Sequence, residues 1–187
     1  MTLDDIRADA FRSLSRGVAD RRSAFRNPAL GTVGLDGRPV VRTVVLRAFD
    51  PQARMLTVHS DTRASKINEI KGNPAVTLHV WDPGAQVQVR VDGDASVLAG
   101  EDARSDWARL HAGSRAAYTV RPNPATTLAD PATADVDRLD EDAAFANFAV
   151  LRVLLTGLEW LHLGRDGHRR AMFEWTGEGM MQRWVVP

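Results

Sequence analysis

The sequence predicts a mainly β protein with a few helices, in which an antiparallel sheet closes, or nearly closes, into a barrel. Three observations lead to this fold class: many short apolar segments at even spacing, turn sequences between them, and few segments with helical periodicity. Asp36-Gly37 is the strongest turn sequence, because Asp-Gly favours a two-residue hairpin. With 187 residues, 44% of them hydrophobic, the chain can bury one core, and we expect a single domain over residues 1–187.

The first expected element is a helix over residues 3–22, where acidic residues precede an apolar stripe at helical spacing. Strands follow, and the first three of them are expected to form an antiparallel meander. The expected strands cover residues 29–35, 39–49, 55–59, 76–81, 86–94, 148–163, 168–175 and 180–186.

Two further helices are expected between these strands. Asp61 or Thr62 is expected to cap a short helix that ends at Gly72-Asn73-Pro74. Another helix is expected over residues 101–112, and a long loop rich in Pro, Thr and Asp over residues 114–140.

The composition excludes several classes of function. Lys plus Arg and Asp plus Glu number 24 each, so the chain has no overall attraction to nucleic acid. The absence of cysteine excludes thiol nucleophiles and cysteine-ligated zinc, and the five scattered histidines lack the HExxH spacing, so no metal is expected. No apolar run approaches the roughly 20 residues that span a bilayer. The acidic N-terminus lacks the apolar region of a signal peptide, so we expect a cytoplasmic protein without a membrane partner.

The most informative stretch covers residues 42–93. It begins with the strand sequence RTVVLR, continues to a helix with Ser65 and Lys66 in its first turn, and ends on a strand that carries Gln88 on its polar face. A helix N-terminus, a lysine and an arginine attract an anion, and a carboxamide pairs with a ring edge that both donates and accepts. These groups suit an anionic heteroaromatic ligand. Taken alone, however, the same residue types favour a solvated helix side and an exposed strand face.

The spacing of two arginines on the strand predicted over residues 39–49 argues against a ligand site that both of them share. Arg42 and Arg47 are five positions apart, so ideal alternation places them on opposite faces. Both can reach one ligand only if the strand bulges or the ligand lies across the strand end.

The order of the motifs RTVVLR, VHSD, TRASK and QVQVRVDG resembles the pyridoxamine 5'-phosphate oxidase family and related FMN-binding split barrels. The similarity covers about residues 30–98 and is weaker over residues 158–175. It implies a split β-barrel that binds FMN at the interface of a homodimer, with Arg42 on the phosphate and Gln88 near the ring. The C-terminal match admits Leu161 in place of Trp160 and Arg169 in place of Arg170. The implied cofactor contacts are Arg42, Thr43, Val44, Val45, Arg47, His59, Ser60, Ser65, Lys66, Gln88, Trp160 and Arg170.

The sequence also departs from the family at several positions. Ser65 replaces an arginine, Arg47 replaces a lysine, and residues 114–127 lack the Gln-Ser pair. The substrate-binding Arg-x-His pair is missing, since Arg169 is followed by Arg170 and Ala171. The resemblance therefore implies an FMN-dependent oxidoreductase for an unidentified small molecule, with no catalytic residue assigned. A non-catalytic flavin carrier, sensor or stress protein and a true oxidase with an altered substrate site remain alternatives.

Overall fold

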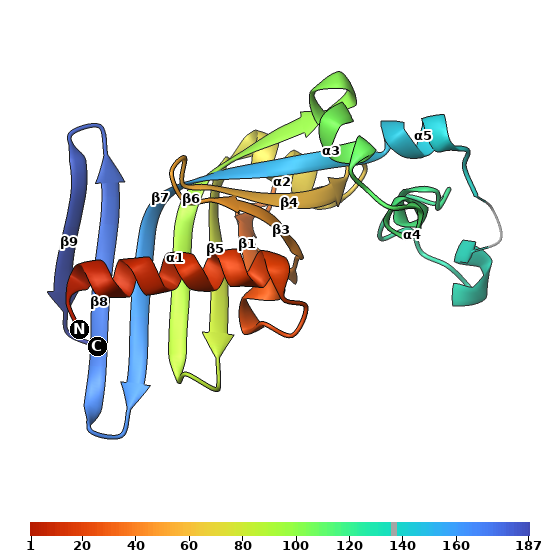
Figure 1. Cartoon of the computed structure of the whole chain (residues 1–187). Coiled ribbons are helices and arrows are strands. Elements are labelled where there is room, and N and C mark those ends of the chain that lie inside the picture. The colour runs from red at the N-terminus through yellow and green to blue at the C-terminus, as the bar shows by residue number, and fades with distance from the viewer. Residues whose placement is uncertain (136–137) are drawn as a thin grey trace.

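A computed structural model describes residues 1–135 and 138–187, and these form one antiparallel sheet with short helices around it (Figure 1). The nine strands within the described residues are β1 (Ala29–Val33), β2 (Pro39–Thr43), β3 (Leu46–Asp50), β4 (Met55–Asp61), β5 (Ala75–Asp82), β6 (Val87–Ala99), β7 (Phe148–Gly164), β8 (Gly167–Thr176) and β9 (Gly179–Val185). Their order is β2-β1-β5-β6-β7-β4-β3, with β8 on β7 and β9 on β8. The mainly β prediction is confirmed, and the sheet is not closed.

The long strands β6 and β7 divide the sheet into two parts. The first half of β7, from Phe148 to Leu154, pairs with β4, and its second half, from Gly157 to Gly164, pairs with β8. β6 lies along both halves, and its register with β7 shifts between Asp92 and Gly93, where Thr156 of β7 is the extra residue. A Cβ atom at position 93 would lie 2.4 Å from the carbonyl oxygen of Leu154, so this close approach requires glycine. The neighbouring strands therefore form two groups in Figure 1: an upper group that includes β3 and β4, and a lower group that includes β5, β8 and β9.

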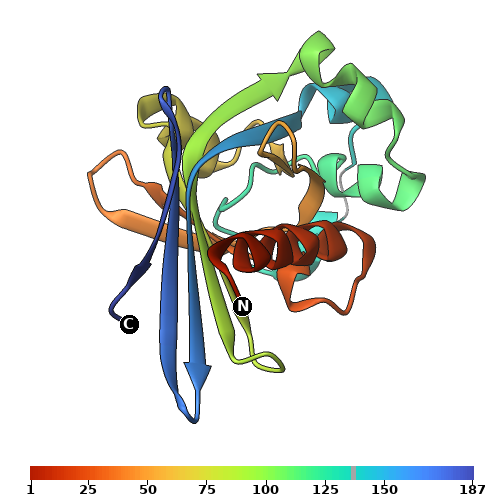
Figure 2. The same cartoon turned by 60° about the vertical axis from the view of Figure 1, so that its left-hand side comes forward.

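One face of the lower group is covered by α1 (Leu3–Ala19), whose N-cap is Thr2. The buried side of α1 presents Ile6, Ala10 and Leu14 to the same apolar core as Val89, Trp160 and Phe173 of the sheet. Figure 2 shows the long strands nearly edge-on, with α1 on one side only. The helix predicted over residues 3–22 is thus confirmed, although it ends at Ala19.

The segment between β6 and β7 forms a helical arm, which we define as residues 100–147. Its helices are η2 (Gly100–Ala103), α3 (Arg104–Ala108), α4 (Ala112–Arg115), η3 (Ala116–Tyr118), η4 (Pro131–Asp135) and α5 (Glu141–Ala146). Trp107, Tyr118 and Phe148 form the centre of a second, smaller apolar core. The helix predicted over residues 101–112 is confirmed in part, by η2 and α3 over residues 100–108, and the loop predicted over residues 114–140 contains helical turns where it is described. Residues 136–137 of that loop lie outside the described residues.

The strand predicted over residues 39–49 is two strands. β2 pairs with β1 at one end of the sheet order and β3 pairs with β4 at the other, so the predicted three-strand meander is wrong. The chain leaves β2 where the backbone N–H of Val44 donates to the carbonyl of Pro28 at 3.0 Å. The hairpin at Asp36-Gly37 is confirmed, because Gly34 N–H donates to Arg38 at 2.7 Å and Gly37 adopts a φ of 80°.

The short helix α2 (Ser65–Gly72) starts differently from the prediction. Its N-cap is Ala64, and no side chain makes a capping hydrogen bond. The Asp61 carboxylate instead accepts hydrogen bonds from the backbone and side chain of Arg63, so the predicted cap at Asp61 or Thr62 is wrong. The later predicted strands correspond to β5–β9, with β6 extending to Ala99. Another short helix, η1 (Ala24–Arg26), connects α1 to β1.

Candidate functional site

The N-terminus of α2 has the features of an anion site. No side chain makes a capping hydrogen bond to the first-turn N–H groups, which lie at the positive end of the helix dipole. Lys66 lies in this turn, and its Nζ donates to the hydroxyl of the buried Ser60 at 3.2 Å. Burial and the nearby Arg42 lower the pKa of Lys66, partly opposed by Asp61 and Glu69. The structure therefore brings together Ser60, Ser65 and Lys66.

Arg42 reaches the same region from β2. Its Nη2 lies 2.5 Å from Oε2 of Glu69, and its Nη1 donates to the hydroxyl of Thr32. Thr32 in turn donates to Glu69 at 2.6 Å. No motif in the sequence indicated Glu69, although its place between Ile67 and Ile70, on the apolar side of α2, was a signal for a buried acidic residue. Arg42 is thus positioned by an ion pair before any ligand binds.

The short backbone segment that follows Arg42 joins the two strands. Thr43 ends β2 on an exposed position, Val44 is buried, and Val45 is half-buried. These three residues lie where the predicted continuous strand breaks. They carry the chain from Arg42 toward Arg47.

Arg47 occupies a bulge in β3. The β3–β4 register shifts between Leu46 and Ala48, which leaves Arg47 as the extra residue. A bulge was one of the two conditions under which Arg42 and Arg47 reach a common ligand. In the part of the chain that the structure describes, the buried Nε of Arg47 has no hydrogen-bond partner. Arg47 therefore offers a partly buried donor to a ligand.

His59 lies beside Arg47 where β4 meets the helical arm. Its ring packs edge-on to Phe148 with centroids 5.0 Å apart, and within the described residues its buried Nδ1 has no hydrogen-bond partner. Burial and then Arg47 lower the pKa of His59 to about 4, against a weaker opposing effect of Asp106. Burial raises the pKa of Tyr118 to about 12, which Arg47 opposes. His59 is thus neutral at pH 7, in an electropositive environment.

A second group of predicted residues lies on the lower sheet. Gln88 of β6 pairs with Leu161 of β7, and Leu161 pairs with Arg170 of β8, so these three side chains share one face. Trp160 points to the opposite face, where it is 4% exposed and stacks on His162 with centroids 5.8 Å apart. Arg169 pairs with His162 and so also belongs to that opposite face. The register therefore favours Leu161 over Trp160, and Arg170 over Arg169, as neighbours of Gln88.

Arg170 is held by a buried carboxylate that no sequence motif indicated. Its Nη2 lies 2.7 Å from Oε2 of Glu159, and the Glu159 side chain is 4% exposed. Arg90 lies 3.4 Å from the same oxygen. The face that carries Gln88 thus presents two ordered guanidinium groups.

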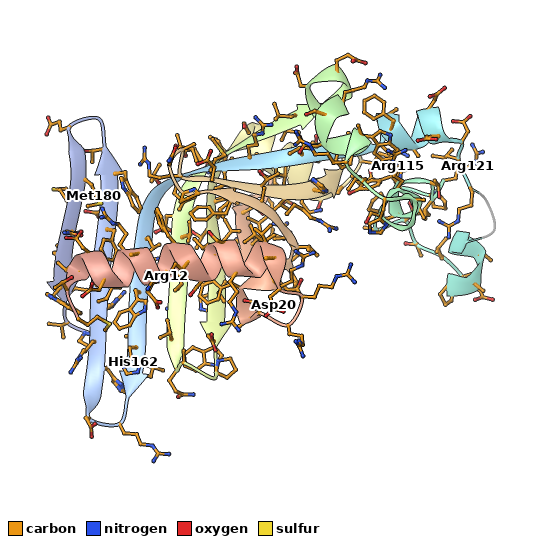
Figure 3. The ribbon with its side chains drawn as sticks, in the orientation of Figure 1. Arg12, Asp20, Arg115, Arg121, His162 and Met180 are labelled. Carbon is orange, nitrogen blue, oxygen red and sulfur yellow. The ribbon has the colours of Figure 1, made fainter. Side chains whose placement is uncertain are left out.

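The group of residues around Lys66 and the group around Gln88 lie at different ends of the molecule. Arg63, two residues before α2, donates to the carbonyl of Arg121 in the helical arm at 2.9 Å. His162 pairs with Val87, which neighbours Gln88. Figure 3 places Arg121 in the arm and His162 near the opposite, lower end of the sheet. One chain therefore does not bring Lys66 and Gln88 together.

The described residues contain no group of three or more His, Asp or Glu side chains arranged to hold a metal ion. They also contain no helix with the length and apolar character needed to cross a membrane.

The comparisons with known proteins agree with the motifs and with the fold. The family described as the FMN-binding domain of pyridoxamine 5'-phosphate oxidase matches residues 9–99. Over these residues the chain is similar to that family. The match includes α2, Arg42, Arg47 and Gln88, so the resemblance seen in the sequence is confirmed.

The alignments with curated relatives cover different fractions of those proteins. The chain is 27% identical to pyridoxine/pyridoxamine 5'-phosphate oxidase of Gluconobacter oxydans over 95% of its own length and 92% of the relative. It is 35% identical to pyridoxine/pyridoxamine 5'-phosphate oxidase 2 of Arabidopsis thaliana over 69 residues, which span 37% of this chain and 35% of that protein.

Solved structures of the family show the same fold. A pyridoxamine 5'-phosphate oxidase-related FMN-binding protein of Nostoc punctiforme aligns with a TM-score of 0.80 at 22% identity, over 100% of both chains. PhzG of Burkholderia lata, solved with tetrahydrophenazine-1-carboxylic acid, aligns with a TM-score of 0.74 at 17% identity, over 99% of this chain and 90% of that one. At these identities the likeness supports the split-barrel fold alone.

Proposed function

We propose that this protein is an FMN-binding oxidoreductase that acts on a small molecule. The observation that carries the proposal is the uncapped N-terminus of α2, with Lys66 in its first turn and Arg42 beside it. Uncapped N–H groups and cations are the usual partners of a phosphate. Arg47, with its buried unpartnered Nε, suits the negative charge that a reduced flavin acquires.

A homodimer with FMN between its subunits is part of the proposal. Gln88 and Arg170 lie far from Lys66 in one chain, and a second copy related by two-fold symmetry supplies them to the same ligand. The face that carries Gln88 also has exposed apolar side chains, including Trp81, Leu163 and Met181, which a partner would cover. FMN supplies the redox chemistry when bound, and the protein supplies its orientation and charge environment.

Purification of the protein tests the cofactor directly. We expect a yellow protein that releases FMN on denaturation, identified by its mass and absorbance. A colourless protein that takes up no added FMN contradicts the proposal.

Turnover then separates an enzyme from a carrier or sensor. A steady-state assay with NADPH and common electron acceptors supports an oxidoreductase if it shows catalytic turnover. Bound FMN that stays inert under these conditions favours a non-catalytic flavoprotein. Oxygen-dependent formation of pyridoxal 5'-phosphate is the specific result that would identify a true oxidase, despite the missing Arg-x-His pair.

A further inference from the structure

Glu69 is a buried negative charge in a site whose other groups attract anions. Its side chain is 7% exposed and accepts hydrogen bonds from both Arg42 and Thr32. Burial raises the pKa of Glu69, but hydrogen bonds from Thr32, Arg42 and Ser65 outweigh this effect and hold the pKa below its usual value. The carboxylate is therefore ionised at neutral pH.

The charges around α2 do not all remain available to a ligand. Arg63 is already paired with Asp61 at 2.7 Å, and both side chains are largely buried. Arg42 and Lys66 are the cations proposed to face the phosphate, and Glu69 offsets the charge of Arg42. A phosphate monoester carries a charge of about −1.5 to −2 at pH 7, so an ionised carboxylate next to Arg42 repels it.

Glu69 also has a favourable effect on the same site. An arginine side chain has several rotatable bonds, and ordering it costs conformational entropy. The two contacts to Glu69 and Thr32 hold the Arg42 guanidinium in one place before a ligand arrives. Glu69 thus lowers the cost of ordering Arg42 while it weakens the attraction of the site for an anion.

We propose that Glu69 is a positioning residue that limits how much the phosphate group contributes to ligand affinity at this site. The inference rests on the proposed function, in which Arg42 and Lys66 face the phosphate. It implies that the preference of the protein for FMN over riboflavin is set by the balance between Arg42, Lys66 and Glu69. Neutralising Glu69 increases that preference, and loosening Arg42 decreases it.

Two substitutions separate charge from position. Glu69→Gln keeps the shape of the side chain and one acceptor oxygen but removes its charge. Thr32→Val removes the hydroxyl contact to Arg42 and Glu69 but leaves every charge in place. The dissociation constants of FMN, riboflavin and inorganic phosphate are measured for both variants and the wild type, with thermal unfolding as the check of folding.

For Glu69→Gln we expect FMN and inorganic phosphate to bind at least about tenfold more tightly, and riboflavin to change by less than about twofold. For Thr32→Val we expect FMN to bind about threefold more weakly, with riboflavin unchanged. An FMN dissociation constant that stays the same or rises in folded Glu69→Gln overturns the inference. A merely structural role of Glu69 would instead weaken FMN and riboflavin equally.

A second comparison covers the case in which Glu69→Gln does not fold. Arg42→Gln leaves Glu69 facing the phosphate, whereas Arg42→Gln with Glu69→Gln removes both charges and leaves no unpaired ion. We expect the double variant to bind FMN at least about tenfold more tightly than Arg42→Gln alone, and equal affinities overturn the inference. A wild-type protein that binds phosphate but no FMN overturns the proposed function, while the phosphate measurements still test Glu69.

Discussion

The guanidinium of Arg63 makes a two-point contact with the carboxylate of Asp61. Nε lies 2.9 Å from Oδ1 and Nη2 lies 2.7 Å from Oδ2, and the two side chains are 17% and 13% exposed. The same guanidinium donates to the carbonyl oxygens of Val120 and Arg121 at 3.0 and 2.9 Å. This pair therefore fastens the helical arm to the loop directly before Ser65 and Lys66.

Replacing Arg63 by alanine is expected to lower the free energy of unfolding by about 2–3 kcal/mol, because it removes charge-assisted bonds and leaves a largely buried carboxylate unpaired. Chemical denaturation measures the change. Arg38→Ala is the matched control, since its ion pair with Asp36 is 3.7 Å long and its side chain is 84% exposed. We expect that control to cost less than about 0.5 kcal/mol. Equal losses in the two variants would show that burial does not strengthen the Arg63 pair.

Ligand affinity tests the cations at α2. Arg42→Ala and Lys66→Ala are each expected to weaken FMN binding at least tenfold, about 1.4 kcal/mol, and to leave riboflavin binding nearly unchanged. Quenching of flavin fluorescence on binding gives both constants. Lys71→Ala is the control, because Lys71 is an exposed cation in the last turn of the same helix, away from its N-terminus. If Lys66→Ala and Lys71→Ala have the same effect, the phosphate does not lie at the N-terminus of α2.

Local sequence patterns predicted the elements better than their connections. Alternation along residues 86–94 placed Val89 and Val91 in the core, and both are buried. The division of residues 39–49 into β2 and β3 depends instead on which distant strands each half joins, β1 or β4. No pattern within those eleven residues contains that information.

The candidate site shows the same limit. The motifs correctly grouped Ser65 and Lys66 on one helix turn, because those residues are neighbours in the chain. The partners that hold the arginines are distant in the sequence: Glu69 is 27 residues from Arg42, and Glu159 is 11 residues from Arg170. The choice between Trp160 and Leu161 required the strand register, since a shift of one residue exchanges the two faces.

His59 is expected to make stability depend on pH below neutrality. Its pKa in the folded protein is about 4, below the ordinary value of 6.5, so the unfolded chain binds a proton more readily between these values. The contribution is present above pH 6.5 and is lost as the pH falls toward 4, by up to about 3 kcal/mol. The free energy of unfolding of the wild type and of His59→Gln, measured from pH 8 to pH 4, isolates this effect, because all other groups titrate in both proteins. A difference between the two that is independent of pH contradicts it.

Mixed dimers test whether two chains build one site. Lys66→Ala damages the α2 side and Arg170→Ala damages the side that carries Gln88, and each variant alone is expected to bind FMN poorly. In a dimer of one variant with the other, a site shared between subunits combines the intact α2 of one chain with the intact Arg170 of its partner. The second site of that dimer carries both substitutions.

Refolding an equal mixture of the two variants is therefore expected to restore wild-type affinity at roughly one quarter of all sites, because about half of the dimers are mixed and each has one intact site. Titration with FMN measures the tight-binding fraction, and each variant refolded alone is the control. A site built within one chain would leave every site with one damaged half, so the mixture would bind no better than its components. That result would also remove the reason to place Gln88 and Lys66 on the same ligand.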